Sequence, residues 1–211
     1  MMSHLKKLIW MLVLFNPTAH SAIISFDGVP SSWEIGTIKN ITDSGYNVSA
    51  TGQWFWISDG TAEFCVPDCP VKNSQYLMTQ HAGNEPILVT SADGNSFNLM
   101  SFEYGERHIT QAYAPQINVI GKSQDGEEIT ASFVLDGVND GSGPLNDFQT
   151  AVLPEAFRNL VSIEFSTSGE GFSLDTIIVN PVPLPAAFWL FSTAIVGLIG
   201  ILRNRNIVRD N

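Results

Sequence analysis

The sequence predicts an all-β fold, a two-sheet antiparallel β-sandwich of the jelly-roll type, with an N-terminal signal peptide and one C-terminal transmembrane helix. Between residues 22 and 180 the chain has short β-rich runs separated by Gly, Asn, Asp, Ser and Pro, and no long helical periodicity. A charge-free apolar run lies near each end of the chain. The expected organisation is a signal peptide (1–21), an exported β domain (22–180), a proline-rich spacer (181–185), a transmembrane helix (186–202) and a basic tail (203–211).

The N-terminal segment has the three-part pattern of a secretory signal. Two lysines precede an apolar run at residues 8–15, and a small-x-small triplet follows at residues 19–21. We expect cleavage after Ser21 or Ala22. An uncleaved anchor helix is the alternative, but this apolar run is far shorter than the roughly 20 residues that span a bilayer.

The C-terminal segment predicts a membrane-spanning helix. Residues 186–202 carry no charge, and as a helix they cover roughly 25 Å at about 1.5 Å per residue. Arg203, Arg205 and Arg209 follow, and such a cluster is held on the cytoplasmic side, which leaves the β domain outside. A buried core helix and a lipid-anchor signal are the alternatives. The first usually has polar positions at helical spacing, and the second usually ends on its apolar run.

The β domain is strongly acidic. The chain has 10 Lys and Arg and 21 Asp and Glu, and residues 22–180 contain five of the former and twenty of the latter, a formal charge of about −15. Binding of nucleic acid or of an anionic lipid surface through this domain is therefore electrostatically disfavoured. Cations and neutral sugars are the compatible ligand classes.

Eleven segments are expected as strands, at a spacing of about 14 residues that suits a two-sheet jelly roll. Apolar residues alternate most clearly with polar ones in 128–135 and 160–166, as in strands with one buried and one wet face. Glycine-containing turns separate several of the segments, and three prolines after residue 180 form a stiff spacer. The expected strands are 22–26, 46–51, 53–58, 75–79, 87–90, 96–104, 116–122, 128–135, 148–153, 160–166 and 172–179.

Cys65 and Cys69 are the two cysteines of the chain, and both lie in the exported domain. We expect them to form a disulfide that closes a tight loop, since export takes them into an oxidising compartment. Two sulfurs separated by three residues can also begin a metal site. No neighbouring histidine or second cysteine pair completes a zinc site, which makes that reading the weaker one.

The spacer and the tail together resemble the VPLPA variant of the PEP-CTERM sorting signal. The proline motif is followed by an apolar segment and then by arginines, in the order of that family, although Asn, Ile and Val interrupt the basic tail. The resemblance implies that an exosortase-type membrane protease recognises the motif and delivers the protein from the inner membrane to the cell surface or extracellular matrix. The residues implied are Val182, Pro183, Leu184, Pro185 and Ala186 as the motif, and Arg203 and Arg205 as the stop.

The β domain is similar to jelly rolls of the carbohydrate-binding-module type in its segments 24–28, 89–102 and 172–179. Independently of this resemblance, sugar binding needs aromatic rings on an exposed face, and the candidates are Trp33, Trp54, Trp56 and Tyr113. Trp54 and Trp56 lie two residues apart in one expected strand, so their indoles point to the same face. That face is either exposed or part of the core.

Carboxylates offer two candidate calcium sites, because Ca²⁺ prefers hard oxygen ligands. Asp27 and Asp175 lie near the ends of the first and last expected strands, while Asp136, Asn139 and Asp140 share one glycine-rich loop. For the loop set, the alternative is that these are turn residues that cap their own backbone. No other cofactor is expected.

Signals of catalysis are weak. The exported domain has two histidines and neither a G-x-S-x-G elbow nor an H-E-x-x-H motif. Its twenty carboxylates can supply a glycosidase pair, but so acidic a domain contains such pairs by chance. The sequence therefore predicts a non-catalytic surface or matrix protein that binds extracellular polysaccharide or a partner. The alternatives are a purely structural component and a carboxylate-dependent glycoside hydrolase.

Overall fold

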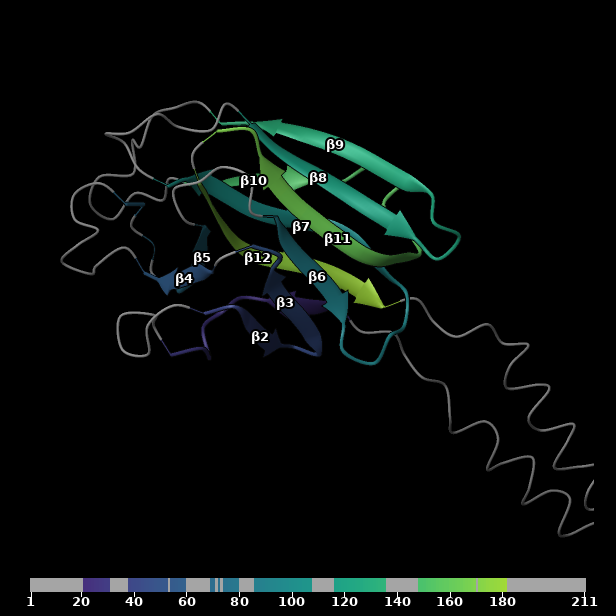
Figure 1. The fold of residues 1–211 in the computed structure, drawn as a ribbon, viewed down its shortest axis with the longest axis horizontal. Helices are drawn as coiled ribbons and strands as arrows, with labels where there is room; N and C mark the ends of the chain where they lie inside the picture. Colours follow the sequence, from purple (N-terminus) through teal and green to yellow (C-terminus); the bar gives the residue numbers. More distant parts are fainter. Residues whose placement is uncertain are drawn as a thin grey trace, which may run out of the picture. The chain divides into compact units, whose positions relative to one another are not determined.

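The strands that the structure describes pair in the antiparallel sense throughout. The computed structural model describes residues 21–30, 38–52, 54–59, 69–70, 72, 74–79, 86–107, 116–135, 148–169 and 171–181, which belong to one compact unit (Figure 1). The strands among them are β1 (Ala22–Ile24), β2 (Asn40–Asp43), β3 (Tyr46–Ala50), β4 (Phe55–Ser58), β5 (Tyr76–Thr79), β6 (Ile87–Ser91), β7 (Phe97–Glu106), β8 (Gln116–Ser123), β9 (Glu128–Val134), β10 (Gln149–Val152), β11 (Leu160–Thr167) and β12 (Phe172–Pro181).

The pairings form two groups, which we call the first and the second sheet. The first sheet has the order β2-β3-β6-β11-β8-β9, and Figure 1 shows these strands following one another across the molecule. The second sheet has the order β4-β5-β12-β7-β10, with β1 also paired to β12. Among the described residues, the pair of Leu160 with Phe97 joins the two sheets, and a bridge between Ile38 and Phe55 joins the segment before β2 to β4.

The two sheets pack face to face through aromatic side chains. Phe102 of the second sheet lies edge-on to Phe165 and Phe133 of the first, with ring centroids 5.0 and 5.3 Å apart. Tyr46 and Phe97 make a similar contact at 5.2 Å. Edge-to-face contacts of this kind add to the burial of the rings themselves. The predicted all-β fold is therefore confirmed, and this packing is consistent with the predicted sandwich.

Each of the eleven expected strands recurs, and β2 is the one that was not expected. Its sequence, Asn-Ile-Thr-Asp, has a single apolar residue, as suits an edge strand that buries little side-chain area. It pairs with β3 through the turn at Ser44 and Gly45, whose φ angles are 51° and 83°. A two-residue hairpin turn of this kind requires two positive φ angles, which glycine adopts readily. The Ser-Gly pair was therefore the sequence signal for the hairpin of β2 and β3.

The predicted terminal segments lie outside the described residues. These are most of the signal peptide, the sorting motif, the transmembrane segment 186–202 and the basic tail. Within the described part of the chain, no helix is long and apolar enough to cross a membrane. The last strand extends to Pro181, which pairs with Phe97, so the first spacer proline still belongs to the sheet.

Candidate functional site

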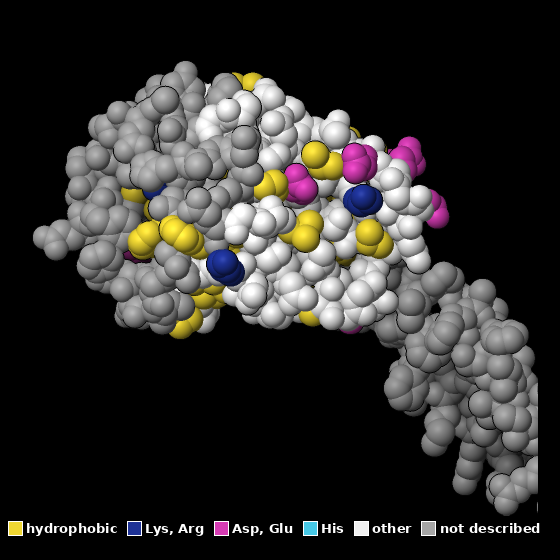
Figure 2. Space-filling view, viewed as in Figure 1, with side chains coloured by type: hydrophobic (Ala, Val, Ile, Leu, Met, Phe, Trp, Pro, Cys, Tyr) yellow, Lys and Arg dark blue, Asp and Glu magenta, His cyan; other side chains and the backbone are white. Residues whose placement is uncertain are grey.

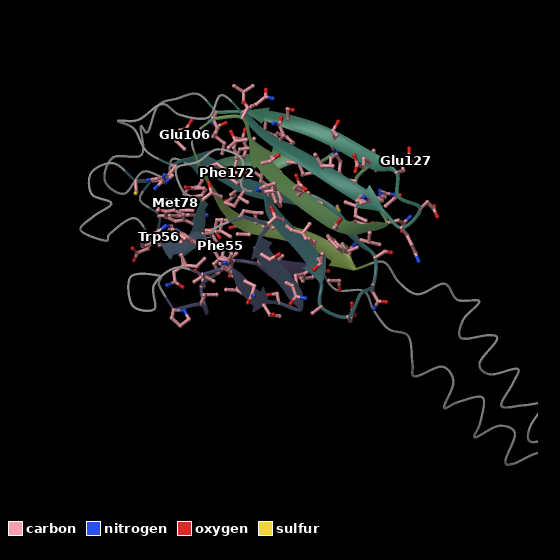
Figure 3. All side chains as sticks on the ribbon, in the orientation of Figure 1. Phe55, Trp56, Met78, Glu106, Glu127 and Phe172 are labelled. Carbon is pink, nitrogen blue, oxygen red and sulfur yellow. The ribbon has the colours of Figure 1, made fainter. Side chains whose placement is uncertain are left out.

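A small apolar cluster covers part of the outer face of the second sheet. Alternation along β4 places Phe55 and Ile57 in the sandwich core, so Trp56 faces outward and pairs across strands with Met78. Figure 3 shows Trp56 and Met78 next to one another, at the end of the molecule far from Glu127. The cluster contains buried Cys69, Tyr76 and Met78, with Trp56 and Phe148 packed against them.

Three charged side chains meet beside this cluster. Glu103 of β7 and Asp175 of β12 are direct cross-strand partners, and the Lys72 ammonium forms ion pairs with both. Its Nζ lies 2.5 Å from Asp175 Oδ2 and 4.6 Å from the centre of the Phe148 ring. Phe148 in turn lies edge-on to Tyr76 at 5.1 Å. We call Lys72, Glu103 and Asp175 the Lys72 cluster.

Asp175 is the most deeply placed member of the Lys72 cluster, with no exposed side-chain surface. Besides Lys72, it accepts hydrogen bonds from the Ser74 hydroxyl at 2.9 Å and from its neighbour Thr176 N–H at 2.7 Å. Burial raises the pKa of Asp175, and the Lys72 ammonium and these hydrogen bonds oppose that rise. A buried carboxylate needs such partners, because an unpaired buried charge is costly.

The backbone next to Asp175 is strained. Thr176 has a φ of 46°, a left-handed conformation that β-branched residues rarely adopt. It lies where the pairing of β12 with β7 shifts register between Asp175 and Ile178. Strain of this kind persists only where the surroundings enforce it and is concentrated at functional sites. The strained residue and the buried charges therefore mark the same place in the fold.

A close backbone approach lies at the start of β12, on the same sheet. A Cβ atom on Gly171 would come within 2.7 Å of the carbonyl and hydroxyl oxygens of Thr79, and within 2.8 Å of Arg107 Cδ. Arg107 is itself buried. Glycine at this position lets the arginine stem lie across the backbone between β5 and β7.

Trp54 and Trp56 are both partly exposed, and neither belongs to the sandwich core. Trp56 packs on the apolar cluster. The indole Nε1 of Trp54 is buried and has no hydrogen-bond partner among the described residues. The other two aromatic candidates, Trp33 and Tyr113, lie outside the described residues.

The two strand-end carboxylates proposed for calcium contact the same short segment. Asp27 is exposed and accepts the Gln75 N–H at 3.0 Å, while Asp175 accepts the hydroxyl of Ser74. In the structure, the positive charge that contacts the Asp175 carboxylate is the Lys72 ammonium. In the described ranges, no group of three or more His, Cys, Asp or Glu side chains is placed to hold a metal ion. The loop set Asp136, Asn139 and Asp140 lies outside those ranges, and calcium binding stays a prediction.

Cys69 is buried in the apolar cluster, and its Sγ lies 3.9 Å from Met78 Sδ. No free cysteine is present in the described part of the chain. Cys65 lies outside it, so the bridge between the two cysteines stays a prediction.

Sequence reasoning did not single out Lys72, Glu103 or Phe148. Lys72 and Asp175 are 103 residues apart in the chain, so no local spacing relates them. One available signal was the scarcity of basic residues, since Lys72 is one of five in a domain with twenty carboxylates. Glu103 and Asp175 share one ammonium on neighbouring strands, which differs from the arrangement across a cleft that a glycosidase pair requires.

Comparison with known proteins shows similarity of fold alone. No family model and no curated protein matches the chain. Among solved structures, a DUF4465 family protein from Bacteroides caccae is 14% identical, with a TM-score of 0.49 over 77% of this chain and 100% of that one. A tandem CBM22 domain of Xyn10C from Paenibacillus barcinonensis is 13% identical, with a TM-score of 0.45 over 80% of this chain and 48% of that one. A family 29 carbohydrate-binding module from Piromyces equi is 10% identical, with a TM-score of 0.41 over 78% and 91%.

Proposed function

We propose that this chain is an exported, non-catalytic surface or matrix protein that binds a neutral glycan on the outer face of the second sheet. The observations that support the proposal are that Trp56 faces outward on β4 and that Trp54, just before β4, is partly exposed and outside the sandwich core. Flat aromatic rings pack against the apolar faces of sugar rings, while nearby polar groups fix their orientation. Trp56 on β4 and Trp54 just before it would supply such rings.

The polar groups needed for orientation lie near the two tryptophans. Met78, the cross-strand partner of Trp56, also pairs with Ser173 of β12, two residues from Asp175. The Lys72 cluster therefore lies one row away, about 7 Å along the strands.

Charge narrows the class of glycan. The domain carries twenty carboxylates and five basic residues, so a polyanionic polysaccharide would be repelled. A neutral polysaccharide pays no such electrostatic penalty. The proposed ligand is therefore a neutral extracellular glycan.

A purely structural component is the second candidate. The observation that favours it is the internal pairing of the Lys72 cluster. Asp175 already forms an ion pair with Lys72 and accepts hydrogen bonds from Ser74 and Thr176. In that case the cluster attaches the chain around residues 72–75 to the second sheet and takes no ligand.

The test is a glycan array probed with the full chain in detergent micelles, with and without Ca²⁺. We expect binding to neutral glycans that the double variant Trp54→Ala/Trp56→Ala loses. Thr130→Ala is the matched control, because Thr130 is an exposed strand residue of the first sheet. An array without any bound glycan supports the structural candidate, and binding that survives in the double variant places the site elsewhere.

We also propose that the protein reaches the cell surface through its C-terminal signal. The support is the order of the motif Val182–Ala186, the apolar segment and the arginines. Scrambling the motif, or replacing Arg203 and Arg205, should change the fraction in which the protein is recovered after cell fractionation. Equal surface delivery of the scrambled form would leave an ordinary single-pass anchor.

A further inference from the structure

Three exposed hydrophobic side chains gather on the outer face of the second sheet. Among the described residues, four large hydrophobic side chains are strongly exposed: Ile23 at 49%, Met100 at 45%, Val152 at 73% and Val134 at 68%. Val134 is on β9 of the first sheet. The other three come from β1, β7 and β10 of the second sheet, which are far apart in the sequence.

The strand register places Ile23 and Val152 on one line across the sheet, and Met100 lies next to that line. Ile23 pairs with Ile178 of β12, Ile178 pairs with Ser101 of β7, and Ser101 pairs with Val152 of β10. Met100 precedes Ser101 at the register shift between β7 and β12. We call Ile23, Ile178, Met100 and Val152 the apolar row. It crosses four neighbouring strands, about 14 Å at the usual strand separation.

The apolar row contains no charged side chain, although the domain around it is acidic. Acidic side chains gather elsewhere, at the turn between β8 and β9, where Asp125, Glu127 and Glu128 are exposed. Figure 2 shows acidic side chains over β8 and β9 at the end where Figure 3 labels Glu127. Single exposed hydrophobic residues are common, whereas several in one row usually mark a contact surface.

β12, at one side of the apolar row, leads to the segment predicted to span the membrane, and β1 beside it begins at the predicted cleavage site. Ile178 lies three residues before Pro181, the last residue of β12, and Ile23 follows the predicted cleavage site. Four residues, 182–185, separate β12 from the apolar segment 186–202. An extended proline-rich spacer of that length covers at most about 12 Å, which limits how far the end of β12 can lie from a bilayer that the apolar segment enters.

We propose that the apolar row docks on the lipid interface of the bilayer that residues 186–202 enter, and holds the second sheet against the membrane while the chain is anchored. This inference rests on the membrane-anchored form within the proposed function. Four side chains are too small an area for a stable dimer, which needs about 800 Å² from each partner. Isoleucine, valine and methionine can instead enter the boundary between headgroups and acyl chains, which requires no complementary shape.

The negative charge of the domain determines which lipid headgroups favour docking. Anionic headgroups repel a domain with a formal charge of about −15, so docking should be strongest on zwitterionic lipid. Raising the anionic lipid fraction at low salt should weaken docking, and added salt should restore it, because salt screens the repulsion.

The test places an NBD fluorophore in the apolar row of the full chain, in phosphatidylcholine nanodiscs. The label is attached at Val152→Cys, and at Thr130→Cys in the matched control, which is an exposed position on a strand of the first sheet. Lipids brominated near the headgroup quench a fluorophore in contact with them. We expect at least about twofold stronger quenching at position 152 than at position 130. Adding Ile23→Asp to the Val152→Cys chain should abolish the difference.

Several outcomes overturn the inference. Equal quenching at the two positions in chains that are incorporated into the discs excludes docking and leaves the proposed anchor intact. Failure of the chain to enter the discs contradicts the anchor and the docking together, although glycan binding is unaffected. Equal quenching at the two positions, together with formation of dimers that Ile23→Asp dissociates, assigns the row to a second copy of the chain.

Discussion

Replacing Lys72 with methionine should strongly destabilise the domain, because it removes the ammonium that Glu103 and Asp175 share. Methionine keeps most of the apolar stem, so the change isolates the charge. Asp175 has no exposed side-chain surface, and removing one partner of a buried ion pair costs about 3–5 kcal/mol. Glu103 is partly exposed and can turn toward water, so we assign most of this loss to Asp175.

The free energy of unfolding that Lys72→Met removes should depend on pH, in a direction set by the pKa of Asp175. Burial raises the pKa of Asp175 in the folded protein above that of the unfolded chain, against the opposing effect of Lys72. The folded state therefore binds this proton more tightly. The stability that this proton contributes is complete below the pKa that Asp175 has in the unfolded chain. It is lost as the pH rises through the pKa that Asp175 has in the folded protein. Without Lys72 the pKa rises further, so Lys72→Met should cost less at pH 5 than at pH 8.

Urea unfolding followed by circular dichroism, with the full chain in detergent micelles, measures these effects. The series consists of the wild type, Lys72→Met, Asp175→Asn and the double variant at both pH values. Asparagine removes the buried charge, so the double variant should regain at least half of the stability that Lys72→Met loses. A loss below about 1 kcal/mol at pH 8, as in an exposed ion pair, would refute the reasoning. So would a loss that is the same at both pH values.

Three further predictions concern packing and covalent structure. Gly171→Ala should lower the free energy of unfolding by about 1–3 kcal/mol, since its Cβ would come within 2.7 Å of two oxygens; an unchanged urea midpoint would contradict this. Phe102→Ala should cost about 3–5 kcal/mol by the same measurement, because this fully buried ring joins the two sheets. Alkylation and mass spectrometry of exported protein should find Cys65 and Cys69 bridged, with little loss of global stability on reduction because the loop is short.

The strands could be predicted because alternation of apolar and polar residues records burial directly. In 128–134 every second residue faces the core, and the structure has the same alternation in β9. β2 was not predicted because an edge strand with one apolar residue has no such alternation. Its signal was the Ser-Gly turn that follows it.

The orientation of Trp54 and Trp56 could be predicted only in part. Their spacing fixes a common face, but Phe55 and Ile57 are equally apolar and occupy the other face. Periodicity cannot tell which face is buried when both are hydrophobic. The choice depends on where the first sheet packs, which is a long-range property of the fold.

The candidate site was less accessible to sequence reasoning than the fold. Asp27 and Asp175 were expected near one another, and both contact the segment of Ser74 and Gln75. Nothing local to Asp175 indicates that Lys72 is its partner. That pairing depends on the placement of a loop residue over the second sheet, and no periodic pattern encodes it.

Isothermal titration calorimetry tests most directly whether Trp54 and Trp56 form a glycan platform. The strongest glycan from the array is titrated into the full chain in micelles, into Trp54→Ala/Trp56→Ala and into Thr130→Ala, after urea unfolding has shown that each is folded. The account predicts an affinity at least about tenfold weaker for the double tryptophan variant and an unchanged affinity for Thr130→Ala. A folded tryptophan variant that binds the glycan as tightly as the wild type would contradict it.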